Sequence, residues 1–109
     1  MNNTTSQKNQ KPEFFLILDK AAAALHRSET DAAYALITEA MLLEPDFPQP
    51  HNLLGIYFEL SGDVDRARRH YRAAYALDPT YTPALGNLER LCLTYESKPL
   101  ACDFGIGVK

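Results

Sequence analysis

Residues Leu42–Phe47 read LLEPDF, and residues Ala76–Tyr81, thirty-four positions further on, read ALDPTY. In each stretch an acidic residue precedes a proline, and an aromatic residue follows two positions after the proline. Because the residue before a proline is disfavoured in the α-helical region, each stretch predicts the end of a helix. The chain can then reverse direction, so the two stretches predict two helix pairs that end in the same way.

The region that leads into these stretches repeats at the same spacing, without a gap. Identical residues recur thirty-four positions apart at Asp31 and Asp65, Ala33 and Ala67, Ala40 and Ala74, Leu43 and Leu77, and Pro45 and Pro79. Ile37 corresponds to Tyr71, and both side chains are large. A fixed period in this range indicates supersecondary units that stack on one another.

Helical periodicity accounts for most of the chain. Apolar residues recur at helical spacing over residues 13–26, 31–43, 49–60, 64–77 and 83–96. No strand-like alternation interrupts these segments. Ser28 and Thr30 are candidate N-caps of the second helix, since their hydroxyls can accept free amide protons. The predicted fold class is all-α, with antiparallel neighbouring helices joined by short turns.

Residues 48–81 carry the most regular copy of the repeat. The positions that form its pattern are Leu54, Gly55, Phe58, Gly62, Ala67, Tyr71, Ala74 and Pro79. With these residues the chain resembles the tetratricopeptide repeat family, although His51 stands where the family has a bulky aromatic residue. The resemblance extends over residues 14–95 and implies a short right-handed α-solenoid of stacked helix pairs.

The resemblance also implies the domain organisation. A repeat domain of residues 13–97 would consist of a degenerate repeat 14–47, a complete repeat 48–81 and a capping helix 82–96. A terminal repeat is expected to be degenerate because it has a neighbour on one side only. Residues 1–12 are polar and predict a disordered N-terminal arm, and residues 98–109 form an apolar C-terminal tail.

Composition narrows the classes of function. The chain has 109 residues and a net charge of −3, and it lacks the basic excess with which a general nucleic-acid binder neutralises phosphates. No apolar run approaches the ~20 residues that a membrane span needs. Cys92 and Cys102 are too few for a disulfide framework, so reduced thiols and a cytoplasmic location are expected. The preferred interpretation of the basic cluster Arg66–Arg72 is a solvated helix face that Asp63 and Asp65 compensate, and the alternative is a basic patch for nucleic acid or an acidic partner.

The sequence offers no catalytic or metal-binding constellation. The carboxylates form no evident acid–base pair, and His26, His51 and His70 lack the i, i+4 spacing of a metalloprotease helix. Cys92 and Cys102 lack the close paired spacing of a zinc site. We therefore expect no enzymatic activity, no cofactor and no metal.

The resemblance points to a concave groove lined by the first helix of each pair. The groove positions that it implies are Phe15, Leu18, Ala22, Asn52, Ile56, Glu59, Gly86, Asn87 and Arg90. Family members bind peptides or extended protein segments there, so the resemblance implies a protein–protein interaction module. A clamp for a C-terminal carboxylate, as in members that bind chaperone partners, is not expected, because Leu53 stands where such a clamp has an asparagine.

The C-terminal tail is unlike a solubilising segment. It carries the apolar residues Leu100, Phe104, Ile106 and Val108. The preferred interpretation is that the tail folds back over Leu91 and its neighbours, where a second helix would have packed. Alternatively, the tail inserts into the groove of another copy and gives a homodimer. The alternative function is then a structural or assembly protein that self-associates through its capping helix and tail.

Overall fold

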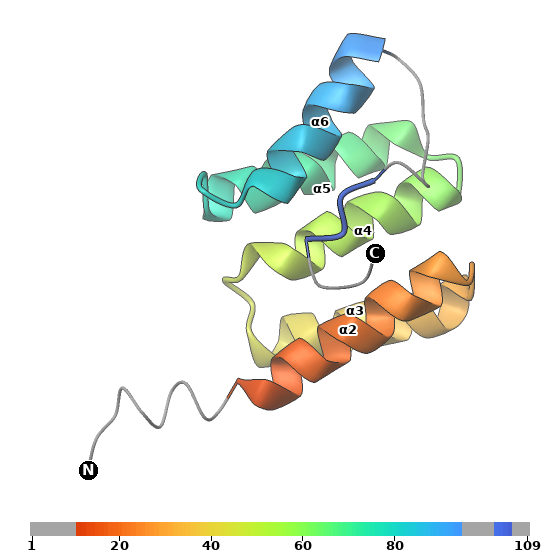
Figure 1. The fold of residues 1–109 in the computed structure, drawn as a ribbon, viewed down its shortest axis with the longest axis vertical. Helices are drawn as coiled ribbons and strands as arrows, with labels where there is room; N and C mark the ends of the chain where they lie inside the picture. The colour runs from red at the N-terminus through yellow and green to blue at the C-terminus, as the bar shows by residue number, and fades with distance from the viewer. Residues whose placement is uncertain (1–10, 95–101, 106–109) are drawn as a thin grey trace.

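The computed structural model describes residues 11–94 and 102–105, which contain five α-helices (Figure 1). The helices are α2 (Pro12–His26), α3 (Thr30–Leu43), α4 (Pro48–Leu60), α5 (Val64–Leu77) and α6 (Thr82–Thr94). The described residues form no strand, so the predicted all-α fold class is confirmed. The predicted helix end at residue 96 and residues 1–10 of the predicted arm lie outside the described residues.

Neighbouring helices pack in pairs that stack on one another. α2 packs against α3, α4 packs against α5, and α6 packs against α5. α4 also contacts both α2 and α3, which joins the first pair to the second. Figure 1 shows the segment of residues 102–105, in dark blue, running across α4. Within the part of the chain that the structure describes, no helix is long and apolar enough to cross a membrane.

The two helix pairs turn at equivalent positions. Gly62 follows α4 with a φ of 83°, and Ser28, thirty-four positions earlier, follows α2 with a φ of 57°. The prediction of Ser28 and Thr30 as N-caps is wrong. The residue that immediately precedes α3 is Glu29, and its side chain makes no cap hydrogen bond. Ser28 has a left-handed backbone conformation and forms the turn between α2 and α3.

Asp63 caps the start of α5 with its side chain. Its Oδ1 accepts a hydrogen bond from the backbone N–H of Arg66 at 3.0 Å. We expect Asp63→Ala to lower the free energy of unfolding by about 1 kcal/mol, because one amide at the helix start loses its acceptor. Urea denaturation followed by circular dichroism measures this loss. Asp63→Asn is the matched control, since asparagine caps equally well, and an equal loss in both variants would contradict the capping role.

Large and small side chains face each other within each helix pair. In the second pair, a Cβ atom placed on Gly55 would overlap the ring of Tyr71, which is fully buried. In the first pair, the equivalent positions hold Ala21 and Ile37, which are also fully buried. Each pair thus reaches close packing with its own matched combination of sizes.

Candidate functional site

Four polar side chains from two helices converge on one side of the molecule, which we call the groove face. Asn52 and Glu59 are seven residues apart on α4 and therefore lie on one side of that helix, two turns apart. Asn87 and Arg90 are three residues apart on α6, so they are neighbours on its surface. Asn52, Glu59 and Asn87 are buried. Buried polar groups require hydrogen-bond partners within the protein, and residues 102–105 supply several of them.

Asn52 and Asn87 hold the main chain of Asp103. Nδ2 of Asn87 donates to the Asp103 carbonyl oxygen at 2.9 Å, and its Oδ1 accepts from the Asp103 N–H at 2.8 Å. Nδ2 of Asn52 donates to the same carbonyl oxygen at 2.9 Å. Asn87 Nδ2 also donates to Asn52 Oδ1 at 2.9 Å, which fixes the two carboxamides relative to each other. Because these bonds use only the main chain of residue 103, other side chains there would leave them intact.

Cys102 lies against a buried ion pair. Arg90 donates to Glu59 through two bonds, from Nη2 to Oε1 at 2.6 Å and from Nη1 to Oε2 at 3.1 Å. The Tyr71 hydroxyl donates to the same Oε1 at 2.6 Å. Cys102 Sγ lies 3.2 Å from Arg90 Nη2 and 3.4 Å from Glu59 Oε1. Burial, reinforced by the charge of Glu59, raises the pKa of the Cys102 thiol to about 12, and the thiol is neutral at pH 7.

Phe104 and Gly105 complete the contact of this segment with the helices. Phe104 is 8% exposed, joins the apolar core, and stacks on His26 with ring centroids 4.0 Å apart. Gly105 has a φ of 73°, and a Cβ atom there would overlap the Tyr81 hydroxyl. Its N–H donates to Asp103 Oδ1 at 3.0 Å, which closes a turn of the Asx type. The segment is therefore fitted by side-chain shape as well as by main-chain bonds.

The predicted groove residues fall into three sets. Asn52, Glu59, Asn87 and Arg90 all contact residues 102–105. Leu18, Ala22 and Ile56 are fully buried in the apolar cluster that also contains Phe104. Phe15 is 39% exposed and packs edge-on against Phe14 and Phe47, while Gly86 is exposed on α6.

Sequence reasoning missed part of this site. The sequence pattern identifies Tyr71 only as a large residue of the repeat, and His26 only as a histidine without the spacing of a metal site. A hydroxyl on a buried aromatic residue needs a partner, so the polar tip of Tyr71 was the available signal. Nothing in the sequence marks His26.

The structure also refines the prediction for the C-terminal tail. Residues 102–105 pack on their own chain, across the groove face. Phe104 belongs to the same apolar cluster as Leu91.

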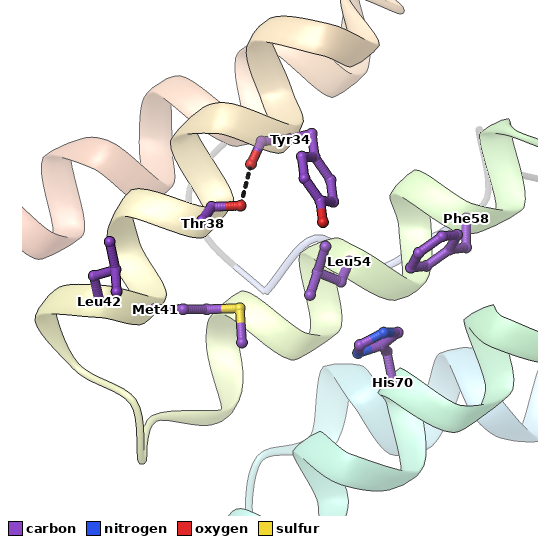
Figure 2. Close-up of a pocket in the computed structure, with 7 residues that line it drawn as sticks. All are labelled: Tyr34, Thr38, Met41, Leu42, Leu54, Phe58 and His70. Carbon is purple, nitrogen blue, oxygen red and sulfur yellow. Dashed lines mark hydrogen bonds between the residues drawn. The ribbon is translucent and has the colours of Figure 1, made fainter.

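A second recess lies on the other side of α4 (Figure 2). It has a volume of about 500 Å³ and is lined by Tyr34, Thr38, Met41, Leu42, Leu54, Phe58 and His70. Position 54 is rotated by roughly 200° about the α4 axis from position 52, at 3.6 residues per turn. Thr38 Oγ1 donates to the Tyr34 carbonyl oxygen at 2.8 Å, which satisfies that hydroxyl within α3. The recess is therefore mainly apolar and distinct from the groove face.

His51 and His70 meet beside this recess. Their Nδ1 atoms are 3.2 Å apart, and the His70 ring stacks on Phe58 with centroids 5.3 Å apart. One Nδ1 donates and the other accepts, so at least one ring must be neutral. Burial lowers the pKa of His51. Burial, followed by the charges of His51, Arg66 and Arg69, lowers the pKa of His70.

This histidine pair predicts a loss of stability in mild acid. Both folded-state pKa values lie below the unfolded value of 6.5, so the unfolded chain binds more protons near that pH. The stabilisation is present above pH 6.5 and declines as the pH falls below it. Urea denaturation over this range should show a decline in the native chain and a smaller one in His51→Gln/His70→Gln. An identical decline in the double variant would contradict the assignment.

Two arginines of the basic cluster on α5 lie near the two aspartates at the start of that helix. Arg66 Nε lies 3.6 Å from Asp63 Oδ2, and Arg68 Nη2 lies 3.6 Å from Asp65 Oδ1. The described ranges, 11–94 and 102–105, contain no group of three or more His, Cys, Asp or Glu side chains placed to hold a metal ion.

The family comparison agrees with this geometry. The tetratricopeptide repeat model matches residues 48–81, the region that contains α4 and α5. Residues 48–81 therefore match a tetratricopeptide repeat, and the five described helices are consistent with repeats of this kind. No solved structure matches the chain. The match supports a protein–protein interaction module in general, since the family is generally non-catalytic.

Proposed function

We propose that this chain, with its tetratricopeptide repeat, is an interaction module whose groove face binds an extended segment of a partner protein. One observation carries the proposal: residues 102–105 already lie on that face. Asn52 and Asn87 hold the main chain of residue 103 through three hydrogen bonds. A surface that recognises one segment through its main chain can recognise another in the same way.

The groups on this face support binding rather than catalysis. Glu59 is held by Arg90 and by the Tyr71 hydroxyl. The Cys102 thiol is neutral at pH 7, whereas a nucleophilic cysteine acts as its thiolate. Two cysteines in 109 residues, too few for a disulfide framework, support a reducing compartment such as the cytoplasm.

The test is a selection of displayed random peptides against the full-length chain. All proteins carry Phe104→Ala, so that residues 102–105 compete less for the face. The selected peptides are then measured by fluorescence anisotropy against Asn52→Leu/Asn87→Leu in this background. We expect binding to weaken at least tenfold, about 1.4 kcal/mol, because the main-chain hydrogen bonds are lost. Replacing both carboxamides by apolar groups of similar size leaves no buried donor between them unpaired.

The matched control alters the same number of polar side chains on α3. Tyr34→Leu/Thr38→Val changes the second recess and should leave the affinity unchanged. The opposite result, in which this control weakens binding and the asparagine variant does not, would move the binding site to the recess and overturn the proposal.

Self-association through the tail is the second candidate, because a neighbouring copy could supply the same contacts to the groove face. Sedimentation velocity over a hundredfold range of concentration separates the two. A monomer throughout, as we expect, contradicts assembly through the tail. A dimer that dissociates in the Phe104→Ala variant would favour assembly.

A further inference from the structure

We propose that the groove face recognises a four-residue pattern, and that residues 102–105 compete in cis with partner segments that carry it. The pattern is a small uncharged residue, then Asp or Asn, then an aromatic residue, then glycine. The inference rests on the proposed function and adds to it the chemistry of the partner segment and the regulation of the site.

The first position is restricted to a small uncharged side chain. Cys102 Sγ is already within 3.2 Å of Arg90 Nη2, 3.4 Å of Glu59 Oε1 and 3.9 Å of the Tyr71 hydroxyl. A longer side chain would have to displace the ion pair between Glu59 and Arg90. A charged one would face a like charge, from Glu59 or from Arg90, at short range. Cysteine, serine and alanine satisfy both restrictions.

The second position is restricted by its turn and not by the helices. The side chain of Asp103 is exposed, and its Oδ1 accepts from the N–H of Gly105. Aspartate and asparagine close such a turn readily. The turn directs the third residue, Phe104, into the apolar cluster and onto the His26 ring. Burial of an aromatic side chain makes this third position the main source of apolar stabilisation.

The fourth position requires glycine for two separate reasons. Its φ of 73° is left-handed, a region that other residues rarely adopt. In addition, a Cβ atom at Gly105 would overlap the hydroxyl of Tyr81, which is itself half-buried. A partner segment without glycine here would have to shift off the two asparagines.

Occupation by the tail and by a partner is mutually exclusive. Asn52 and Asn87 direct their hydrogen bonds to one residue of one segment. Residues 102–105 are tethered to the same chain, which raises their effective concentration at the face. The apparent affinity for a partner falls by the fraction of molecules in which the face is open. Weakening the tail should therefore strengthen partner binding.

The binding test uses a labelled synthetic peptide, LASDFGIG, which copies residues 100–107 with serine in place of the cysteine. Its affinity is measured for the native chain, for Phe104→Ala and for Gly105→Ala. The two variants weaken the tail for different reasons, lost apolar contact and introduced overlap. We expect both to bind the peptide at least tenfold more tightly than the native chain. The matched peptide LASDFAIG, in which alanine replaces the glycine, should bind each of them at least tenfold more weakly.

A second readout leaves the tail intact. In Cys92→Ser, Cys102 is the remaining thiol, and its burial as a neutral group makes it react slowly with iodoacetamide. Saturating LASDFGIG should raise its alkylation rate at least tenfold by displacing the tail, and LASDFAIG at the same concentration should not. This measurement tests the competition between tail and peptide even if Phe104→Ala or Gly105→Ala loses its helical circular dichroism.

The outcomes separate this inference from the function on which it rests. Equal affinity of the native chain and both variants for LASDFGIG overturns the competition, and equal affinity of the two peptides overturns the pattern. Failure of LASDFGIG to bind, while selected peptides bind through Asn52 and Asn87, overturns the inference and leaves the proposed function standing. If selected peptides also fail on the groove face, both are overturned. A native dimer that Phe104→Ala dissociates overturns competition in cis.

Discussion

Arg90→Met is expected to lower the free energy of unfolding by about 3–5 kcal/mol, because it leaves a buried carboxylate without its cation. The Glu59 side chain has no solvent exposure, and that of Arg90 has 16%. Two hydrogen bonds, at 2.6 and 3.1 Å, join the guanidinium to the carboxylate. Methionine retains much of the aliphatic stem, so the loss reports on the charge rather than on a cavity. Urea denaturation measures it.

Removal of the carboxylate should lower the free energy of unfolding less than removal of the guanidinium does. Glu59→Gln is expected to cost less than Arg90→Met, because the guanidinium reaches water and glutamine can still accept from the Tyr71 hydroxyl. The double variant Glu59→Gln/Arg90→Met contains no buried charge and should lie within about 1–2 kcal/mol of the native chain. If Arg90→Met fails to fold, the stability of this double variant still shows whether the unpaired Glu59 carboxylate causes the loss. A loss below about 1 kcal/mol in Arg90→Met would mean that water reaches Glu59 in solution.

The helices were predictable because their ends are marked by local signals. The segment expected over 64–77 matches α5, and the segments expected from 31 and 49 begin one residue earlier, at Thr30 and Pro48. Proline and glycine act on neighbouring residues only, so one sequence suffices to place them. Ser28 shows the limit of this reasoning. A serine is a common N-cap, and its left-handed turn could be inferred only from its correspondence to Gly62.

The site was predictable only in the part that the helix register controls. Asn52, Glu59, Asn87 and Arg90 were selected as first-helix positions, and all four contact residues 102–105. Which face of its own chain the tail covers was not predictable, because no periodicity connects a tail to the surface on which it packs. Cys102 and Glu59 are 43 residues apart in sequence, and their contact depends on how the whole chain packs.

Gly55→Ala is expected to lower the free energy of unfolding by about 3 kcal/mol, at the upper end of what overpacking a core costs. The new methyl group would overlap the Tyr71 ring, whose Cζ would be 2.6 Å from it. The ring is fully buried, and its hydroxyl is bonded to Glu59, so it cannot move aside. Alanine favours helix over glycine by only about 1 kcal/mol, which offsets a minor part of the overlap. Thermal denaturation should show a fall in Tm of about 10–20 °C.

Two comparisons show whether the Tyr71 ring causes this loss. Gly86→Ala makes the same change in α6, where nothing in the described part of the chain, apart from α6 itself, lies within 4 Å of the new Cβ, so it should stabilise the chain by about 0.5–1 kcal/mol. In a Tyr71→Ile background, Gly55→Ala should cost less than about 1 kcal/mol, since the double variant reproduces the Ala21 and Ile37 combination of the first pair. If Gly55→Ala were as harmless as Gly86→Ala, the two helices of the second pair would have to lie further apart than the structure has them.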